Sequence, residues 1–336
     1  MGWFSKRLGL DLGTTNVLIY EGGQIALQEP TLVALMTEDQ RIVDFGQPAR
    51  EMLGRVDEED IQIVRPLQNG AIADYDVTEA MLRHFFDKIA GRIRLVKPTV
   101  MVCVPWGVNT VEKRAVYEAV MSAGAREVFL IWEPLAAAIG AGLPVSTPAG
   151  DMVVNIGGGI TEAAVVTMNN IIRAESGRVG GLRMDDAIIA YVRRKYNLSI
   201  GQPTAEAVKI QIGAAVDLPQ NLSMEVQGRD NVTGLPRSIT MTTGEVCEAL
   251  SEPLQAIAAV VKNALAETPP ELASDIIDRG ITLTGGGALL RGIETYLTQQ
   301  TGVTCYPSDH PLIAAAVGAG RALDDPALMR RIDSLV

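Results

Sequence analysis

The chain has 336 residues, 47% of them hydrophobic, which is long enough to bury the cores of two domains. Its formal net charge of −11 excludes a general electrostatic attraction to nucleic acid, so no nucleic-acid partner is expected. No window approaches the roughly 20 apolar residues of a membrane-spanning helix, and the N-terminus has no secretory-signal pattern. Three scattered cysteines and two histidines predict neither a disulfide framework nor a zinc site, so the cytoplasm is the expected compartment.

The first part of the chain alternates strand-like and helical segments. Residues 8–23 predict a strand, a glycine turn and a second strand, followed by the hairpin dipeptide Gly22-Gly23. Further strands are predicted at 30–36, 41–46, 99–105 and 127–134. Helices are predicted at 77–91, 109–125 and 135–144.

A second strand–turn–strand segment, residues 152–171, repeats this pattern about 144 positions later. In each copy an apolar strand reaches a polar residue, Asp11 or Asn155, before the glycine turn and a second apolar strand. The tight turn that ends the second copy is predicted at Asn169-Asn170. The repetition predicts duplicated halves, each with its loop at a shared cleft, and the alternative is a chance similarity of two hairpins.

Residues 182–245 differ in character from the rest of the second half. Two amphipathic helices at 184–196 and 204–215 precede a polar stretch that we predict to be poor in strands. A helix follows at 244–268, and a last apolar helix at 311–323 is predicted to pack back on the core. We interpret 182–245 as a small inserted subdomain.

A third glycine turn, from Gly285 to Gly287, follows an apolar strand and precedes a predicted helix. A helix N-terminus of this kind receives an anion or packs closely on a flat ring. Taken alone, a triple glycine is more often a tight strand-to-helix turn than a ligand site. Three such turns, each at the end of an apolar strand, favour a ligand.

Five colinear motifs connect the sequence with a known family: LDLGTTN, EPLAAAIGAGLPV, IGGGITE, TAEAVKIQIGAA, and PPELASDI followed by GITLTGGGALLRGIE. Over essentially the whole chain they resemble the MreB family, the bacterial actins. The resemblance implies an α/β, actin-like fold of two duplicated α/β halves, each with a smaller inserted subdomain. ATP and Mg²⁺ are expected in the cleft between the halves.

The division implied by the resemblance has three parts. The first half is expected at 1–145 with an inserted subdomain at about 31–65, and the second half at 146–314 with one at about 182–245. Residues 315–336 are expected to form a C-terminal helix that packs back on the first half.

The family's functional residues match positions of this sequence. Asp11 matches the acidic residue that binds the metal through its water shell, and Glu133 matches the residue that orients the attacking water. Thr161 is a second candidate for catalysis. The other expected cofactor contacts are the phosphate loops Gly13, Thr14, Thr15, Asn16 and Asn155, Gly157, Gly158, Gly159, the ribose-side pair Glu206 and Lys209, and the adenosine turn Gly285, Gly286, Gly287 and Ala288.

Four positions depart from the family pattern. Asn155 and Leu182 stand where aspartate is usual, Ile160 replaces a threonine, and Trp132 replaces a second glutamate before Glu133. We therefore expect retained ATP binding and slow hydrolysis, raised by Asn155→Asp with Ile160→Thr and lowered by Glu133→Ala. The alternative is that Asn155 still bonds a metal-bound water and that Leu182 fills a gap in the core.

Two apolar patches with basic neighbours predict binding to an anionic membrane. Trp3 and Phe4 lie beside basic residues at the N-terminus, and Ile93, Leu95 and Val96 lie within a second basic segment. The alternative is a frayed terminus and an ordinary helix-to-strand connection.

The resemblance also implies partners and a location. We expect a homopolymeric filament of paired protofilaments at the inner, cytoplasmic face of the cell membrane, which works with cell-wall elongation proteins to set cell shape.

Other classes of protein remain as alternatives. A small-molecule kinase on the same duplicated fold needs a catalytic aspartate in a matching motif, and none is spare here. A heat-shock ATPase needs an appended peptide-binding domain. A Rossmann enzyme needs a G-x-G-x-x-G between the first strand and a helix, which is absent.

Overall fold

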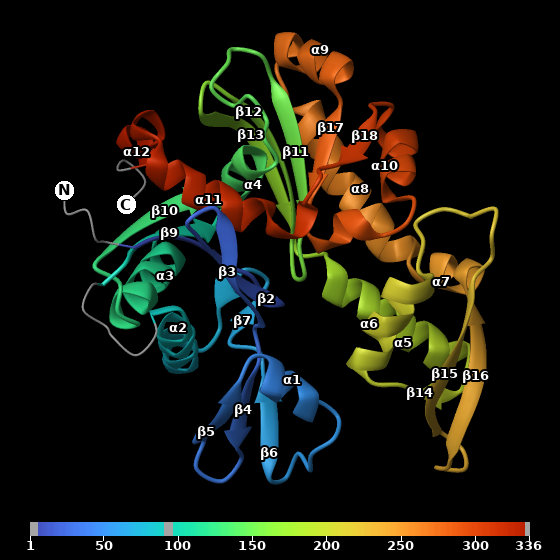
Figure 1. Ribbon diagram of the computed structural model, residues 1–336. Helices are drawn as coiled ribbons and strands as arrows, with labels where there is room; N and C mark the ends of the chain where they lie inside the picture. The colour runs from blue at the N-terminus through green and yellow to red at the C-terminus, as the bar shows by residue number, and fades with distance from the viewer. Residues whose placement is uncertain (1–5, 91–96, 333–336) are drawn as a thin grey trace.

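The computed structural model of the chain describes residues 6–90 and 97–332 (Figure 1). Two five-stranded mixed sheets form its two halves. The first has the order β10-β9-β1-β2-β3, with β1 Arg7–Leu12, β2 Asn16–Glu21, β3 Gln24–Pro30, β9 Thr99–Val104 and β10 Glu127–Trp132. The second has the order β13-β12-β11-β17-β18, with β11 Asp151–Ile156, β12 Thr161–Thr167, β13 Asn170–Gly177, β17 Ile281–Thr284 and β18 Cys305–Pro307.

The two sheets repeat the same strand pairing. Asp11 of β1 lies opposite Leu18 of β2, and Asn155 of β11, 144 positions later, lies opposite Glu162 of β12. In both sheets the first strand also pairs in parallel with a strand that arrives after a crossover, β9 in one and β17 in the other. The prediction of duplicated α/β halves is therefore confirmed.

The hairpin turn of the first copy is the one predicted, and that of the second copy lies one position earlier than predicted. Gly22 and Gly23 form the first turn, and both have positive φ, as a two-residue hairpin loop requires. In the second copy Met168 and Asn169 have φ of 50° and 59°, and Asn170 already pairs in β13. The prediction of Asn169-Asn170 as the turn was wrong by one residue. Asparagine is common in this left-handed conformation and methionine is rare in it, so no residue pattern indicated that Met168 begins the turn.

Helices cover the outer faces of the sheets and also fill the space between them (Figure 1). On the first sheet, α2 and α3 bury Phe85 and Val116. On the second sheet, α8 buries Ile257. The helices are α2 Tyr75–Ala90, α3 Thr110–Ser122, α4 Glu133–Gly140, α8 Ser251–Ala266, α9 Pro270–Arg279, α10 Ile293–Thr301, α11 Ala314–Asp324 and α12 Pro326–Ile332.

The helix pair α4 and α11 lies between the halves and joins them. Their alanines share one apolar cluster with Met101 and Ile131 of the first sheet and with Val153 and Val166 of the second. The last apolar helix therefore packs on the core, as predicted, and it contacts β1 and β9 of the first sheet.

Each half carries a small three-stranded sheet (Figure 1). In the first half the order is β5-β4-β6, with β4 Val33–Met36, β5 Ile42–Phe45, β6 Ile61–Val64 and the helix α1 Gln47–Met52. In the second half the order is β14-β15-β16, with β14 Leu198–Ser199, β15 Ser223–Asp230, β16 Pro236–Thr242 and the helices α5 Gly181–Tyr196, α6 Gln202–Ile212 and α7 Thr243–Ala249. The remaining elements are the hairpin strands β7 Leu67–Gln68 and β8 Ala71–Ile72 and the 3₁₀ turns η1 Gly286–Leu289 and η2 Pro311–Ile313.

The stretch predicted to be poor in strands is a β-hairpin, so that prediction was wrong. Pro236 is the first residue of β16, where a missing N–H costs little, and Gly234 with φ of 73° forms the turn. Gly228 lies within β15 because the strand passes so close to β14 that a Cβ would lie 2.4 Å from the carbonyl oxygen of Ser199. The helix predicted at 244–268 is likewise two helices, α7 and α8.

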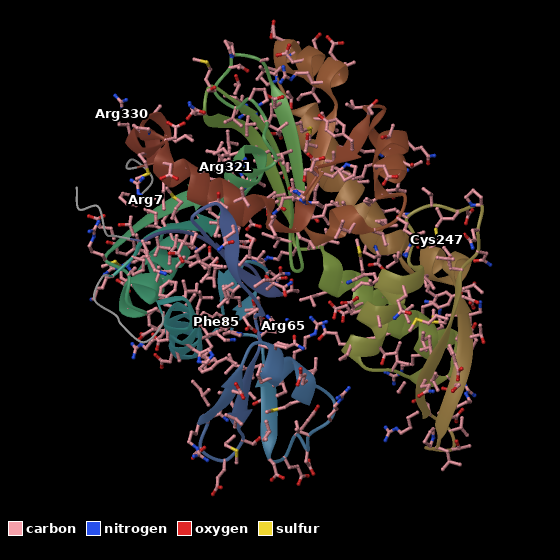
Figure 2. The ribbon with its side chains drawn as sticks, viewed as in Figure 1. Arg7, Arg65, Phe85, Cys247, Arg321 and Arg330 are labelled. Carbon is pink, nitrogen blue, oxygen red and sulfur yellow. The ribbon has the colours of Figure 1, made fainter. Side chains whose placement is uncertain are left out.

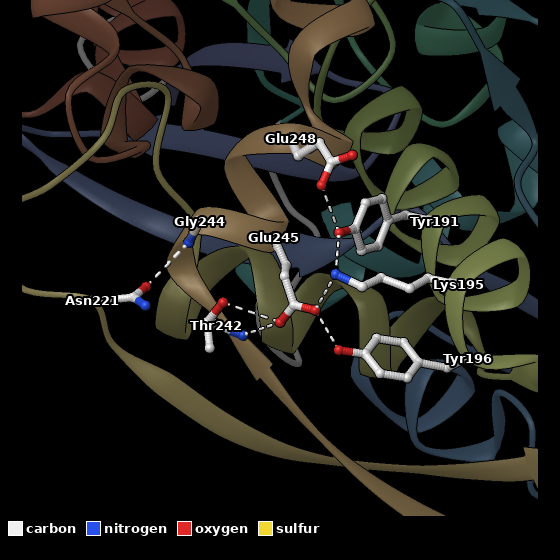
Figure 3. Close-up of polar contacts among 8 residues, drawn as sticks. All are labelled: Tyr191, Lys195, Tyr196, Asn221, Thr242, Gly244, Glu245 and Glu248. Carbon is white, nitrogen blue, oxygen red and sulfur yellow. Dashed lines mark hydrogen bonds and ion pairs between the residues drawn. The ribbon is translucent and has the colours of Figure 1, made fainter.

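A polar network ties α5 to α7 in this small subdomain (Figure 3). Glu245 accepts hydrogen bonds from the backbone N–H of Thr242 at 2.8 Å and from the Tyr196 hydroxyl, and it pairs with Lys195 at 2.8 Å. Although burial opposes ionisation, these donors lower the pKa of Glu245 to about 2. The network fixes the outer face of α5, whose inner face borders the cleft.

Candidate functional site

A cleft of about 460 Å³ opens between the two halves, a volume in the range of small-molecule sites. Its walls come from β1, β2 and α1 on one side and from α5, α6 and the loop after β17 on the other. The predicted residues that line it are Asp11, Gly13, Thr14, Thr15, Asn16, Glu133, Asn155, Gly157, Gly158, Gly159, Glu206, Lys209, Gly285, Gly286 and Gly287.

The two glycine loops have the same turn. The N–H of Gly13 donates to the carbonyl of Asn16 at 3.1 Å, and the N–H of Gly157 donates to the carbonyl of Ile160 at 2.8 Å. Each turn therefore reverses the chain between paired strands and leaves its tip at the cleft. Backbone N–H groups at such tips are suited to cradle phosphate oxygens.

The two loops touch each other, and this explains two of the glycines. A Cβ at Gly158 would lie 2.2 Å from the side chain of Thr15, and one at Gly159 would lie 2.7 Å from the hydroxyl of Thr14. Thr14 also accepts a hydrogen bond from the N–H of Gly70 at 3.0 Å. Only glycine allows this approach, which places the tips of both loops side by side in the cleft.

Two carboxylates, Asp11 and Glu133, and the amide of Asn155 lie at the floor of the cleft, and the carboxylate of Glu162 is buried beneath it. Asn155 donates from Nδ2 to Oε1 of Glu133 at 2.7 Å, and Glu162 accepts from the backbone N–H of Trp106 at 2.6 Å. Burial raises the pKa of Asp11 to about 7 and that of Glu162 to about 8. Burial, with the charges of Glu162 and Asp11, also raises the pKa of Glu133 well above its usual range.

This acid cluster fits a hydrated divalent cation. Oε2 of Glu162 is buried without a hydrogen-bond partner, so the cluster has unmet capacity for positive charge or for a donor. In the parts of the chain that the structure describes, no three acidic, histidine or cysteine side chains are grouped closely enough to bind a metal directly. Mg²⁺ readily keeps several of its waters, and a carboxylate such as Asp11 can bind it through them.

The ribose-side pair on α6 already has partners across and within the cleft. Glu206 pairs with Arg50 of α1 at 2.5 Å, so this contact joins the two small subdomains. Lys209 pairs with the buried Asp185 at 2.7 Å and donates to the carbonyl of Gly181 at 2.9 Å. Sequence reasoning had no signal for Arg50 or Asp185, because both pairings are tertiary.

Arg65, labelled in Figure 2, lines the cleft near this pair. Burial lowers its pKa, and the nearby carboxylate of Glu206 opposes that shift. Arg50 and Arg65 therefore make the α1 side of the cleft basic, whereas the α6 side carries charges of both signs. This residue too went unpredicted.

The third glycine turn differs from the expected strand–helix junction. After β17 the chain forms the short 3₁₀ turn η1, and the helix α10 begins only at Ile293. Gly285 has φ of 79°, and a Cβ at Gly287 would lie 2.2 Å from Ile156. Ala288 is buried and does not line the cleft.

Three exposed apolar side chains surround this turn at the mouth of the cleft. They are Leu289, Leu312 and Ile210, which are exposed and line the cleft. Exposed leucines beside a glycine turn suit a flat ring, which needs an apolar cover. Sequence reasoning found the turn but not the leucines.

Three further positions named from the sequence are Thr161, Ile160 and Leu182. Thr161 is fully buried, donates to the carbonyl of Val179 at 2.8 Å and does not line the cleft, so its hydroxyl is not placed to contact a ligand there. Ile160 is buried and packs near Gly70 of the β7–β8 hairpin. Leu182 does line the cleft, and its N–H donates to the carbonyl of Gly158 at 2.9 Å.

An aromatic pair lies behind the acid cluster. The rings of Trp106 and Trp132 are 4.9 Å apart, and the ammonium of Lys113 lies 4.4 Å from the centre of the Trp132 ring. Trp132 ends β10, so the next residue, Glu133, is the first residue of α4 rather than part of the strand. The pair is thus linked to both carboxylates, because Trp132 precedes Glu133 in the chain and the backbone N–H of Trp106 donates to Glu162.

The predicted membrane contacts Trp3, Phe4, Ile93, Leu95 and Val96 lie outside the described residues. Among the residues that are described, no helix is both long and apolar enough to cross a bilayer.

Comparison with solved structures identifies the fold. MreB 5 of Spiroplasma citri bound to AMPPNP matches with a TM-score of 0.90 at 34% identity, covering all of both chains. A MamK double helical filament matches with a TM-score of 0.79 at 19% identity, covering 96% of this chain and 99% of that one, which supports the fold alone. The duplicated sheets and the cleft between them therefore define an actin-like protein.

Sequence comparison identifies the family. The profile described as MreB/Mbl protein matches residues 5–331, and the chain belongs to this family. The cell shape-determining protein MreB of Escherichia coli K12 is 48% identical over 329 residues, which cover 96% of this chain and 94% of that protein. The cell shape-determining protein Mbl of Bacillus subtilis 168 is 42% identical over 323 residues, 96% of this chain and 97% of that protein.

Proposed function

We propose that this chain binds ATP with Mg²⁺ in the cleft, hydrolyses it slowly, and polymerises into filaments that help set cell shape. The observation that carries the proposal is the meeting of the two glycine loops beside the acid cluster of Asp11, Glu133 and Glu162. The related MreB 5 of Spiroplasma citri has structures bound to AMPPNP and to ADP, which supports a nucleotide in the corresponding cleft.

Each part of the cleft suits one part of the nucleotide. The backbone N–H groups of the two loops would hold the phosphates, and the turn at Gly285 with Leu289 and Leu312 would cover the base. Glu206 and Lys209 border the ribose. Asp11 would hold Mg²⁺ through water, and the ion would neutralise charge on the phosphates.

Glu133 is the proposed catalytic residue. As the first residue of α4 it points its carboxylate to the cleft floor, where it would orient a water molecule for attack on the terminal phosphate. The neighbouring position 155 is an asparagine, whose amide donates to Glu133 at 2.7 Å. Ile160 and Leu182, which line the cleft, supply neither a hydroxyl nor a carboxylate, so slow turnover is the expected result.

Filament formation and membrane binding complete the proposal. A MamK filament with the same fold is a double helix, which supports self-association of this chain, and we propose paired protofilaments. The apolar residues Trp3 and Phe4, with the 93–96 segment, would hold the filament on an anionic surface at the inner face of the cell membrane. There it would organise cell-wall elongation proteins.

Pelleting and phosphate release test the proposal together. Purified protein at micromolar concentration is sedimented with ATP, ADP or no nucleotide, with and without anionic vesicles, while phosphate release is followed. We expect a nucleotide-dependent pellet and a turnover that Glu133→Ala lowers by at least about tenfold.

Two results would reject the proposal. Absence of polymer under every condition removes the cytoskeletal function. Phosphate transfer to a sugar hydroxyl in a parallel screen, in place of release to water, would identify a kinase.

A further inference from the structure

Asn155 makes two hydrogen bonds that fix its side chain. Its Nδ2 donates to Oε1 of Glu133 at 2.7 Å, and its Oδ1 lies 3.2 Å from the hydroxyl of Thr284. Asn155 is the last residue but one of β11, and Thr284, the last residue of the neighbouring parallel strand β17, lies directly opposite it in register. The side chain is only 4% exposed, so its amide has little access to water.

The orientation of this amide follows from its partners. The nitrogen of Asn155 faces Glu133, which suits an ionised carboxylate because that group can only accept. The amide oxygen then faces Thr284, whose hydroxyl can donate to it. The result is a directed chain of hydrogen bonds from Thr284 through Asn155 to Glu133, formed by residues of three separate elements.

An aspartate could not replace this arrangement. It would supply no donor to Glu133, and it would add a carboxylate to a buried site that already holds Asp11, Glu133 and Glu162. Two carboxylate oxygens at such a short distance repel each other unless a proton lies between them. The neutral amide avoids this repulsion and also holds the carboxylate in one position.

We propose that Asn155 is a positioning residue that holds the Glu133 carboxylate, through a hydrogen-bond chain from Thr284, in the orientation needed to align water for attack. The inference rests on the proposed ATPase function and deepens it. It assigns position 155 a role in catalysis through Glu133, in contrast to the sequence-based hypothesis that asparagine here is only a loss of charge near Mg²⁺. The two hypotheses predict opposite effects of Asn155→Asp.

Turnover kinetics separate them. We expect Asn155→Ala and Asn155→Asp each to lower kcat by about 10- to 100-fold, the value of a hydrogen bond to a charged group. KM for ATP should change by no more than about threefold, because the loop contacts to phosphate remain. A rise of kcat in Asn155→Asp would overturn the proposal.

Strand β17 supplies a matched pair of control variants. Thr284→Val removes the hydroxyl behind Asn155 and should lower kcat by about three- to tenfold. Thr282 is equally buried on the same strand and face, but its hydroxyl has no hydrogen-bond partner. Thr282→Val should therefore leave kcat unchanged, and equal losses in the two valine variants would argue against the chain.

A double-mutant cycle on stability tests the contact without any turnover. Unfolding is measured for Asn155→Ala, Glu133→Ala and the double variant. If the two side chains act as a pair, the double variant should be about tenfold more stable, in its unfolding equilibrium constant, than the two single effects predict. Additive effects would overturn the proposal.

The outcomes also separate this inference from the proposed function. Normal turnover with additive variants rejects the positioning role and leaves the ATPase intact. A wild-type protein without any ATP turnover rejects the proposed hydrolysis, and the positioning role with it.

Discussion

The crossing of α4 and α11 allows one prediction of stability with a worked magnitude. A Cβ at Gly318 of α11 would lie 1.7 Å from the carbonyl oxygen of Ala136 in α4 and 2.8 Å from the N–H nitrogen of Gly140. Real Cβ contacts essentially never fall below 3.0 Å, so Gly318→Ala must separate the helices by roughly 1.3 Å. Both obstructing atoms are backbone, and no side chain can rotate away.

The expected loss combines two opposing terms. Overpacking of this kind costs about 1–3 kcal/mol, and we take the upper end because the helices lie between two sheets. Alanine in a helix recovers about 1 kcal/mol relative to glycine. The net loss for Gly318→Ala is therefore about 2 kcal/mol, which a urea unfolding curve in nucleotide-free buffer resolves as a lower midpoint.

Gly244 provides the matched control. It lies in helix α7, and a Cβ there meets nothing within 4 Å. Gly244→Ala should leave the midpoint unchanged or raise it slightly. If Gly318→Ala is as stable as wild type, the two helices are not in the close contact described and the reasoning fails.

Three further predictions concern charges and the terminus. Lys209→Met removes the partner of Asp185, whose pKa burial already raises to about 6, so the folded state prefers the protonated acid. The stability that this proton provides is complete below pH 3.8 and is lost as the pH rises through about 6. At pH 8 Asp185 is ionised and needs Lys209, so the variant should lose about 3 kcal/mol of unfolding free energy there and much less at pH 5, where the acid is mostly protonated. Urea unfolding curves at the two pH values measure the difference. Arg50→Glu places like charges beside Glu206 and should weaken ATP affinity in calorimetry by about 3- to 10-fold, less at high salt; an unchanged affinity would mean that the pair is incidental. Deletion of residues 1–7 should reduce co-sedimentation with anionic liposomes, and equal binding of both forms would remove the proposed anchor.

The sequence predicted the parts of this fold that have a local signal. Alternating apolar strands and glycine turns are repeated at a fixed spacing, so the duplication and both glycine loops could be predicted from the sequence alone. The β15–β16 hairpin was missed because Gly228 and Pro236 normally interrupt strands. Gly228 fits its strand because β14 lies close beside it, and Pro236 fits because it is the first residue of its strand. Both conditions arise from the tertiary structure. The division into subdomains at particular boundaries stays a prediction.

The site was predictable by residue type but not by pairing. Asp11, Glu133 and the glycine turns were found because motifs place them at strand ends. The bond from Asn155 to Glu133 joins two elements through the fold, and no spacing in the sequence indicates it. Thr161 is the reverse case, since its motif position suggested the cleft while its side chain points to the carbonyl of Val179.

The tryptophan pair gives this protein a built-in optical reporter. The chain has three tryptophans, and Trp3 lies outside the described residues, so a Trp3→Phe variant would emit only from Trp106 and Trp132. Trp132 directly precedes Glu133 in the chain, and the backbone N–H of Trp106 donates a hydrogen bond to Glu162. A ligand that shifts these carboxylates is therefore expected to change the environment of the two indoles. Intrinsic fluorescence would then follow events at the cleft floor in real time, in solution or in a filament, with no attached dye.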